Sequence, residues 1–298
     1  MKEKLTSYNR FEYYSPYLRI FVCLYMFKDI FTMWSFNDII YKGNSFLVSE
    51  NSSYLNYFSI DIMWFREYFY QFYFIYIILI FLFLFGIGKR ITPLLLFLSL
   101  GIVQSIAWLT LNGGDNILRF VLFYFIFIDS YTKFSLFNTH KNNNEPSKLS
   151  ILLSNLGGYS LCFHFCLVYF ISAVHKIHSD VWFNGVATFY VLASERFQGT
   201  SWNNLLIKNG VFVTLTTYGT IFIELFFPFL VWNKHLKFIF LALALSLHLG
   251  IAVFMMLYDF QILFIMILGL FITNKEWITI SQQFKIKFST VKAKFIKA

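Results

Sequence analysis

Residues 169–190 bring together side chains that can exchange a proton, at the point where a long apolar run ends. His175, Lys176 and His178 come within about one helical turn, and Trp182 follows them. A lysine at a helix end ordinarily faces water, but an amine held between aromatic loops is partly desolvated, which lowers its pKa and lets it act as a base. This pattern predicts general acid–base chemistry with Lys176 as the base.

Metal binding is the alternative use of the same residues. His175 and His178 stand at i and i+3, so both would face one ion if the helix continued that far. Catalytic zinc sites ordinarily take three protein ligands, and Asp180 is the only further ligand type close by. The chain also contains no nucleophile elbow, Walker loop or dinucleotide-binding glycine pattern. We therefore predict no metal site and favour the acid–base centre.

Two more polar side chains stand in the middle of apolar runs. Glu224 lies in TIFIELFFPFLVW, where Pro228 cannot donate to the carbonyl of Glu224. This predicts either a kinked helix with a polar pocket or a neutral carboxyl bonded to a neighbouring helix. His248 stands alone in LALALSLHLGIAVFM and is either a buried hydrogen-bond partner or a functional group. A charge inside a membrane helix costs roughly 2.5–3.5 kcal/mol, so each is a functional candidate.

The segment NGGDNILR, residues 112–119, is expected to form a tight outer turn. Gly113 and Gly114 would provide the turn, Asp115 would cap the next helix, and Arg119 would lie in reach of Asp115. Capping with an ion pair is one interpretation, and anion binding at the helix N-terminus is the other. Asp115 and Arg119 are therefore candidate ligand-binding residues, together with Glu224 and Trp182.

The first apolar run carries three charges. Arg19 near its start can extend to the inner membrane interface. Lys28 and Asp29 near its end are neighbours in sequence and would point in different directions, which argues against an ion pair between them.

The composition is that of an all-α integral membrane protein. Apolar residues make up 58% of the 298 residues, only 13% are charged, and the long apolar runs approach the ~20 residues that a spanning helix needs. The net charge of +9 is spread between these runs and over the C-terminus, which suits anionic lipid headgroups and excludes a nucleic-acid groove. The eight predicted helices cover residues 17–34, 69–87, 91–111, 116–130, 151–174, 211–232, 236–257 and 260–273.

The lysines and arginines predict the orientation of these helices. With the N-terminus in the cytoplasm and the helices alternating, sixteen of the 24 basic residues fall inside and five fall outside. Because cytoplasmic loops carry the excess of positive charge, both termini are predicted to be cytoplasmic. Lys176 then lies on the extracytoplasmic side. Residues 1–273 form a single transmembrane domain in this interpretation, and residues 274–298 form a basic cytoplasmic tail.

The segment YFISAVHKIHSDVWFNGVATFY resembles the signature of the horizontally transferred transmembrane (HTTM) superfamily, which includes the vitamin K-dependent γ-carboxylases. LRIFVCLYMFKDI and NGGDNILRFVLFYFIFID extend the resemblance in the same order over residues 15–270. It implies that Lys176 matches the family lysine that activates vitamin K hydroquinone, with His175 at the preceding lysine. His248 stands at the place of a family histidine.

Two departures separate the chain from the carboxylases. Gly113 and Gly114 stand where the carboxylases have an Asn-His pair whose histidine assists catalysis. A large lumenal portion that holds the substrate propeptide is replaced here by a short lysine-rich tail. The size is similar to that of a short bacterial branch, which includes the membrane protein needed to mature the sporulation-delaying peptide toxin.

The resemblance implies a multi-pass protein of the bacterial cytoplasmic membrane that helps mature or modify an exported peptide or protein at the extracytoplasmic face. Lys176 would be the base or the key polar contact, with His175, His178 and His248 in support. One alternative is a quinol-dependent enzyme that holds vitamin K hydroquinone or menaquinol near Glu224 and His248. A non-catalytic membrane scaffold is the other. Membrane lipids are partners in every case.

Overall fold

The computed structural model describes residues 2–42, 62–136 and 146–296, and all regular structure within these ranges is helical. The helices are α1 Lys2–Ser7, α2 Ser15–Met33, α3 Ile62–Glu67, α4 Phe69–Leu84, α5 Ile91–Ile106, α6 Gly113–Phe125, α7 Lys148–Ile177, α8 Asp180–Phe183, α9 Ala187–Ala193, α10 Trp202–Leu206, α11 Gly210–Leu230, α12 Lys237–Met255, α13 Tyr258–Leu268 and α14 Asn274–Ile296. Single turns of tighter or wider helix lie at Trp34–Phe36, Asp38–Lys42, Trp108–Thr110, Glu195–Phe197 and Gly269–Phe271.

Each of the eight predicted apolar runs coincides with a helix, namely α2, α4, α5, α6, α7, α11, α12 and α13. Among the described residues, α7, α11 and α12 are long and apolar enough to cross a membrane, and α13 with the first part of α14 adds a fourth if that bent pair is one span. α4 and α5 are apolar but shorter. These helices indicate a membrane protein, whereas a bilayer crossed by all eight stays a prediction.

Local sequence explains where several helices begin and end. Pro16 stands in the first turn of α2, where its missing N–H costs nothing. Ser147 accepts from the Ser150 N–H at the start of α7, and Asn209 accepts from the Phe212 N–H at the start of α11. At the other end of α12, Met256 takes a left-handed conformation with φ 54°, which stops the helix.

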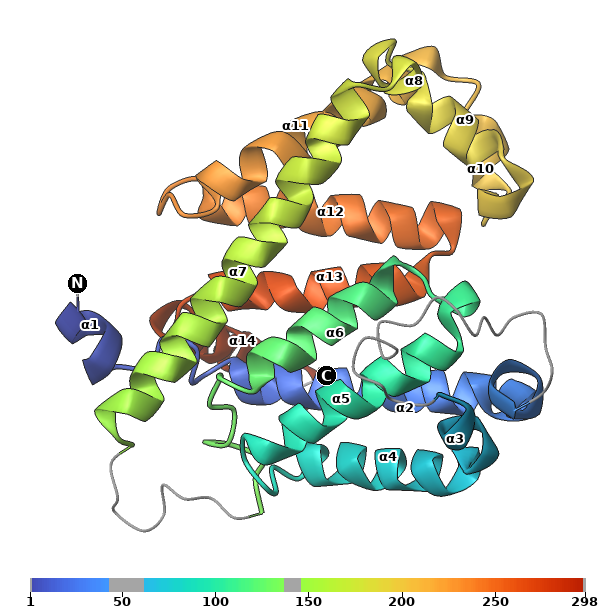
Figure 1. The fold of residues 1–298 in the computed structure, drawn as a ribbon. Coiled ribbons are helices and arrows are strands. Elements are labelled where there is room, and N and C mark those ends of the chain that lie inside the picture. The colour runs from blue at the N-terminus through green and yellow to red at the C-terminus, as the bar shows by residue number, and fades with distance from the viewer. Residues whose placement is uncertain (1, 43–61, 137–145, 297–298) are drawn as a thin grey trace.

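The long helices form two layers that meet along α6, α7 and α13 (Figure 1). One layer runs through α2, α4, α5 and α6, each packed against the next. The other runs through α7, α11, α12 and α13 in the same manner. α13 also touches α2 and α6, and α6 touches α7, which joins the layers into one bundle. The short helices α8 to α10 lie at the end of the bundle away from the N-terminus.

Aromatic rings fill the centre of the second layer. Tyr169 stacks on Phe227 of α11 with ring centroids 4.6 Å apart, and Phe165 lies 5.0 Å from Phe264 of α13. Phe227 in turn meets Phe271 edge-on at 5.3 Å. All five side chains are buried, and each such pair adds about 0.5–1.5 kcal/mol beyond the burial of its area. These rings set the register of α7 against α11.

Arg19 lies inside the bundle, so the expectation that it extends to the membrane interface is wrong. Its side chain is 0% exposed, and its guanidinium donates to the carbonyls of Ser130 at 2.6 Å, Phe134 at 2.5 Å and Lys133 at 3.2 Å. α6 has ended by this point, which leaves these carbonyls outside any helix. The guanidinium stays inside because its planar set of donors can satisfy several of them at once.

The N-terminal segment joins the two layers at one end of the bundle. The Arg10 guanidinium donates to the Leu270 and Phe271 carbonyls at 3.4 and 3.2 Å, and the Arg10 N–H donates to Asn155 Oδ1 at 2.8 Å. The Asn155 amide donates in return to two carbonyls of the N-terminal segment. The helix ends that meet here belong to α2, α7 and α13. The charge count assigns all of these ends to one side of the membrane, and their convergence fits an alternating path.

Gly158 allows a close approach that a larger residue would prevent. A Cβ at Gly158 in α7 would lie 2.3 Å from the buried ring of Phe11, whereas a Cβ at Gly219 in α11 would meet nothing within 4 Å. We expect Gly158→Ala to lower the stability by about 1–3 kcal/mol, because the ring must move. Gly219→Ala is the matched control and should be neutral or stabilising by up to about 1 kcal/mol. Thermal unfolding in detergent, followed by helical circular dichroism, measures both, and equal midpoints would contradict the packing described.

Candidate functional site

Lys176 and Glu224 form an ion pair between α7 and α11, which we call the Lys176–Glu224 pair. The Lys176 ammonium donates to both carboxylate oxygens of Glu224, at 2.9 and 2.7 Å, and to Ser172 Oγ at 2.6 Å. The side chains of Lys176 and Glu224 are 19% and 13% exposed. The pair is therefore largely enclosed by protein but can still be reached from outside. Neither prediction made for Glu224 from the sequence had named Lys176 as its partner.

The two helices bring these side chains together in different ways. α7 ends at Ile177, so Lys176 lies in its last turn, and Ser172 lies one turn earlier on the same side. α11 continues through Pro228 to Leu230, and Glu224 lies one turn before the proline, within the helix. The lysine thus reaches from the end of one helix to the side of another.

Trp182 covers the ammonium group of Lys176. The Nζ atom lies 5.1 Å from the centre of the indole ring, a distance typical of a cation–π contact. α8, which carries Trp182, is held by Tyr218 of α11, whose hydroxyl donates to the Phe183 carbonyl at 2.7 Å. Gly185 takes φ +73° just after α8, and a Cβ there would lie 2.9 Å from the Tyr218 ring. The turn therefore requires glycine on both counts.

His248 is a fully bonded core residue on α12. It is 5% exposed, and its two ring nitrogens contact the Tyr169 hydroxyl and the Gln261 amide oxygen. An amide oxygen only accepts, so Nδ1 carries the proton and Nε2 accepts from Tyr169. This arrangement matches the hydrogen-bond interpretation of His248. A quinol held here would have to displace Tyr169 or Gln261.

The two other predicted histidines lie outside the pair. His175 and His178 are exposed at the end of α7, and His178 Nδ1 bonds back to the Val174 carbonyl at 2.8 Å. Within the part of the chain that the structure describes, no three His, Cys, Asp or Glu side chains are grouped to hold a metal ion. Of the predicted acid–base residues in this segment, only Lys176 meets a charged partner.

Asp115 and Arg119 belong to a separate cluster between α5 and α6. Asn112, not Asp115, is the N-cap of α6: its side chain accepts from the Gly114 N–H at 2.6 Å, while Asp115 accepts from the Asn112 N–H at 2.7 Å. This is a capping box, in which Asp115 holds the third helical position. Arg119 Nε donates to Gln104 Oε1 at 2.7 Å, and Gln104 Nε2 donates to the Asp115 carbonyl at 3.0 Å. Gln104 therefore links the two predicted partners.

Gly113 and Gly114 are the first residues of α6, so the expectation that they form a turn is wrong. A Cβ on Gly113 would lie 2.7 Å from the ring of Phe260, and one on Gly114 would lie 3.1 Å from the hydroxyl of Tyr25. Their small size serves close packing of α6 against α13 and α2.

Lys28 and Asp29 do form an ion pair, contrary to the expectation from their adjacency. Lys28 Nζ lies 2.6 Å from Asp29 Oδ1 and also contacts Asp259 at the start of α13. The flexible lysine stem allows Nζ to bend back over the Tyr25 ring, 4.6 Å from its centre. Asp115 lies within Coulombic range of this group.

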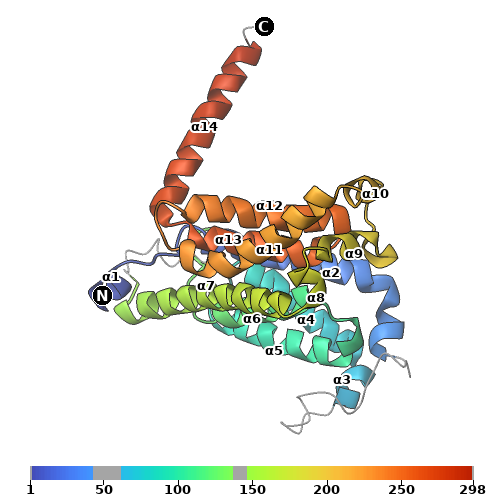
Figure 2. The same ribbon diagram turned by 90° about the horizontal axis from the view of Figure 1, so that it is seen from above.

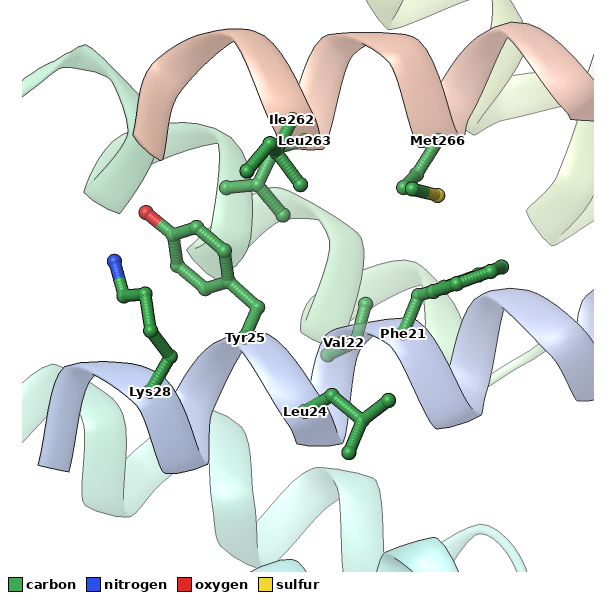
Figure 3. A pocket seen from close by; sticks show the side chains of 8 residues that line it. All are labelled: Phe21, Val22, Leu24, Tyr25, Lys28, Ile262, Leu263 and Met266. Carbon is green, nitrogen blue, oxygen red and sulfur yellow. The ribbon is translucent and has the colours of Figure 1, made fainter. Parts of the chain in front are cut away.

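A small pocket lies between α2 and α13, next to the cluster of Lys28, Asp29 and Asp259 (Figure 3). It holds ≈ 210 Å³, and its walls are apolar except at one end, where Lys28 and the hydroxyl of Tyr25 lie side by side. Its lining includes neither Lys176 nor Glu224. The pocket is therefore separate from the Lys176–Glu224 pair.

Several residues of these clusters were not predicted from the sequence, among them Ser172, Tyr169, Gln104, Gln261 and Asp259. Ser172 and Tyr169 stand four and seven residues before Lys176, a spacing that puts all three on one side of a helix and could have identified them. Asp259 is an acidic residue at the start of an apolar run, and this position could have identified it as well. Its pairing with Lys28, by contrast, depends on how α2 packs against α13.

The Lys176–Glu224 pair is suited to moving a proton. In an ion pair, the ammonium has its proton and the carboxylate has none. If the proton passes along the 2.7 Å contact, Lys176 becomes a neutral amine and Glu224 a neutral acid, with no change in the charge of the site. Such a transfer is easier where little water is present, because burial disfavours two separate charges. The pair can thus provide a free amine as a base.

Comparison of the chain with family models, with curated proteins and with solved structures finds no match in any of the three.

The ion pair makes a prediction about stability. Removing one partner leaves the other charge buried, so Lys176→Met and Glu224→Gln should each destabilise the protein, with ~3–5 kcal/mol expected for a fully buried pair and less for this partly exposed one. The double variant should recover most of the loss. Thermal unfolding of the four proteins in lipid nanodiscs gives the coupling. Strictly additive losses would show that the two charges do not interact.

Proposed function

We propose that this chain is an HTTM-type protein of the bacterial cytoplasmic membrane, which matures or modifies an exported peptide or protein at the extracytoplasmic face. The observation that carries the proposal is the Lys176–Glu224 pair, enclosed by Trp182 but open to one side. The residue that the sequence singles out as a base thus has an acidic partner within hydrogen-bond distance. A lysine that only ends a helix needs no such partner.

The proposed chemistry is proton abstraction by the Lys176 amine. Glu224 first takes the ammonium proton, and the amine then accepts a proton from a substrate group that approaches on the open side. Trp182 stabilises the ammonium that forms, because the face of an indole ring attracts a cation. Ser172 fixes the direction of the Nζ atom through its bond at 2.6 Å. His248 and Gln261 have a positioning role, since they hold Tyr169 and with it the register of α7 on α11.

The extracytoplasmic location rests on the charge count together with the convergence of the opposite helix ends around Arg10. α8 to α10 lie at the far end of the bundle from that junction (Figure 1). They carry exposed aromatic side chains such as Phe183, Tyr190 and Trp202. Aromatic residues of this kind favour the membrane–water interface. A peptide leaving the membrane would meet this surface first.

Labelling of single cysteines tests the orientation. The native cysteines Cys23, Cys162 and Cys166 are buried, so their background labelling should be low. In intact bacterial cells, a membrane-impermeant maleimide should modify Lys208→Cys, because position 208 is exposed and follows α10. Lys148→Cys, at the start of α7, should react only after the cells are opened. The reverse pattern would place Lys176 in the cytoplasm and overturn the proposal.

Loss of maturation tests the function. The protein is expressed with each small secreted peptide that the neighbouring genes encode, and mass spectrometry of the secreted peptides measures the change. Lys176→Ala and Glu224→Gln should abolish it, because the first lacks the base and the second cannot accept the ammonium proton as a carboxylate. Lys208→Ala is the matched control and should be fully active.

Lys176→Arg separates catalysis from structure. An arginine keeps the ion pair but does not give up its proton at neutral pH, so this variant should be folded and inactive. Full activity of Lys176→Arg or Lys176→Ala would favour a non-catalytic scaffold. If the purified protein instead forms an epoxide from vitamin K hydroquinone or menaquinol, and Lys176→Ala does not, the substrate is a quinol.

A further inference from the structure

α14 turns away from the bundle at a joint that several side-chain contacts hold in place. A break of a few residues separates it from α13, and the two helix axes differ by 107°. The Glu276 carboxylate accepts from the Thr273 N–H at 2.7 Å and the Glu276 N–H donates to Thr273 Oγ1 at 3.3 Å, which forms the capping box of α14; the Thr273 hydroxyl also lies 2.8 Å from the carboxylate. Lys237 of α12 donates to both Glu276 oxygens at 2.6 Å. Burial raises the pKa of the Glu276 carboxyl, but Lys237 and Thr273 outweigh this effect, so the pKa lies below its ordinary value.

Aromatic and amide contacts hold the same joint from the other side. The Trp277 ring stacks on Tyr14, with centroids 5.0 Å apart and planes inclined by 1°, and its indole N–H donates to the Gly269 carbonyl at 3.0 Å. The Asn274 amide donates to the Asn9 carbonyl at 2.9 Å. The direction of α14 is therefore fixed by α2, α12, α13 and the N-terminal segment together.

This direction makes α14 nearly perpendicular to α13, so that it extends away from the bundle. Figure 2 shows it rising from the end of the bundle while the long helices run roughly side by side. If α13 crosses a bilayer, a helix at 107° to it lies close to the plane of the membrane surface. The composition of α14 argues against a continued span: residues 274–298 contain six lysines and a single acidic residue. Placing that many charged side chains in the hydrocarbon core of a membrane would cost much free energy.

The sequence of α14 is that of an interfacial helix. Apolar residues recur three or four positions apart at 277, 280, 284, 288, 291 and 295, while the isoleucines at 278, 286 and 296 stand off this stripe. Lysines at 285, 287, 292 and 294 fall on both borders of this stripe. A helix with one apolar stripe and basic borders is typical of a membrane-surface helix, whose lysines meet anionic headgroups. Phe284, in the stripe, is 71% exposed.

An apolar groove lies in the corner between α14 and the bundle. It holds ≈ 700 Å³ and is lined by α2, α12, α13 and α14, including Tyr14, Leu245, Met266, Trp277 and Phe284. Trp277, Ile280 and Phe284 of the stripe therefore face the same space as the outer sides of the long helices. The rings of Tyr13, Tyr14 and Trp277 stack at its inner edge, where interfacial aromatics are expected.

We propose that α14 lies on the surface of an anionic phospholipid bilayer at the side of the two chain termini. Acyl chains occupy the corner groove, and the lysines of α14 bind the headgroups above it. Charge complementarity favours anionic lipid over a second protein. The apolar groove is bordered by a strongly basic helix, and anionic lipid supplies acyl chains for the groove and negative headgroups for the lysines. The inference is independent of the Lys176–Glu224 pair.

Spin labels on the full-length protein test the placement of α14. Phe284→Cys and Gln282→Cys are labelled separately and reconstituted in vesicles of phosphatidylcholine alone or mixed with phosphatidylglycerol. In mixed vesicles, oxygen should reach the label at 284 several-fold more than the label at 282, and a water-soluble nickel reagent should show the reverse. The contrast should weaken without phosphatidylglycerol. Position 282 is the matched control, since it is exposed and stands off the apolar stripe.

A lysine series supplies the second measurement. Changing Lys285, Lys287, Lys292 and Lys294 to Gln in turn should shift the docking equilibrium by about fivefold per lysine, in line with about 1 kcal/mol for each basic residue at an anionic surface. High salt should have the same effect as the substitutions. Equal nickel access at both positions would overturn the proposal. Shielding of position 284 from both reagents would also overturn it, because a protein would then fill the groove.

Discussion

A polar side chain inside an apolar helix bundle must find its partner within the protein, because hydrocarbon and apolar helix faces offer none. This constraint accounts for each internal polar contact described above. Arg19 binds the carbonyls that follow α6, His248 lies between Tyr169 and Gln261, and Lys176 meets Glu224. Each contact joins a helix to another segment of the chain, from 13 residues away for His248 and Gln261 to more than 100 for Arg19 and Ser130. The polar residues thus determine which helices are neighbours, while the aromatic rings between them fill the volume.

The Lys176–Glu224 pair differs from the other internal contacts in its surroundings. Arg19 and His248 are enclosed by protein, whereas the pair lies at the end of α7 under a single indole ring. A structural ion pair gains little from such a position, because replacing it with apolar residues often costs nothing. The pair's accessibility at a helix end is what the proposed proton transfer requires. The charged cluster of Lys28, Asp29 and Asp259 has a different character, since it ties the end of α2 to the start of α13.

Sequence reasoning found the helices and the lysine but not the partners. An apolar run is a local property, and so residues 91–111 predict α5 without knowledge of its neighbours. Lys176 is likewise conspicuous because it ends such a run. Its contact with Glu224 depends on the register of α7 against α11, which aromatic packing fixes and no local pattern reveals. The adjacency of Lys28 and Asp29 was misleading, because neighbouring backbone positions point in different directions but a flexible lysine stem can still bend back to its neighbour. The cap of α6 was misplaced because Asn112 and Asp115 are both good capping types, and only the geometry distinguishes them.

The junction around Arg10 has a consequence for the order in which the chain is assembled. Its guanidinium binds carbonyls about 260 positions later, at Leu270 and Phe271, and its neighbours Asn9 and Tyr13 bind Asn274. A chain made and inserted from its N-terminus cannot close these bonds until the last helix has emerged. The segment around Arg10 therefore reaches its final place only after residues made about 260 positions later have emerged. Until then its donors must be satisfied by water or headgroups at the membrane surface, and closure of this junction marks a completed bundle.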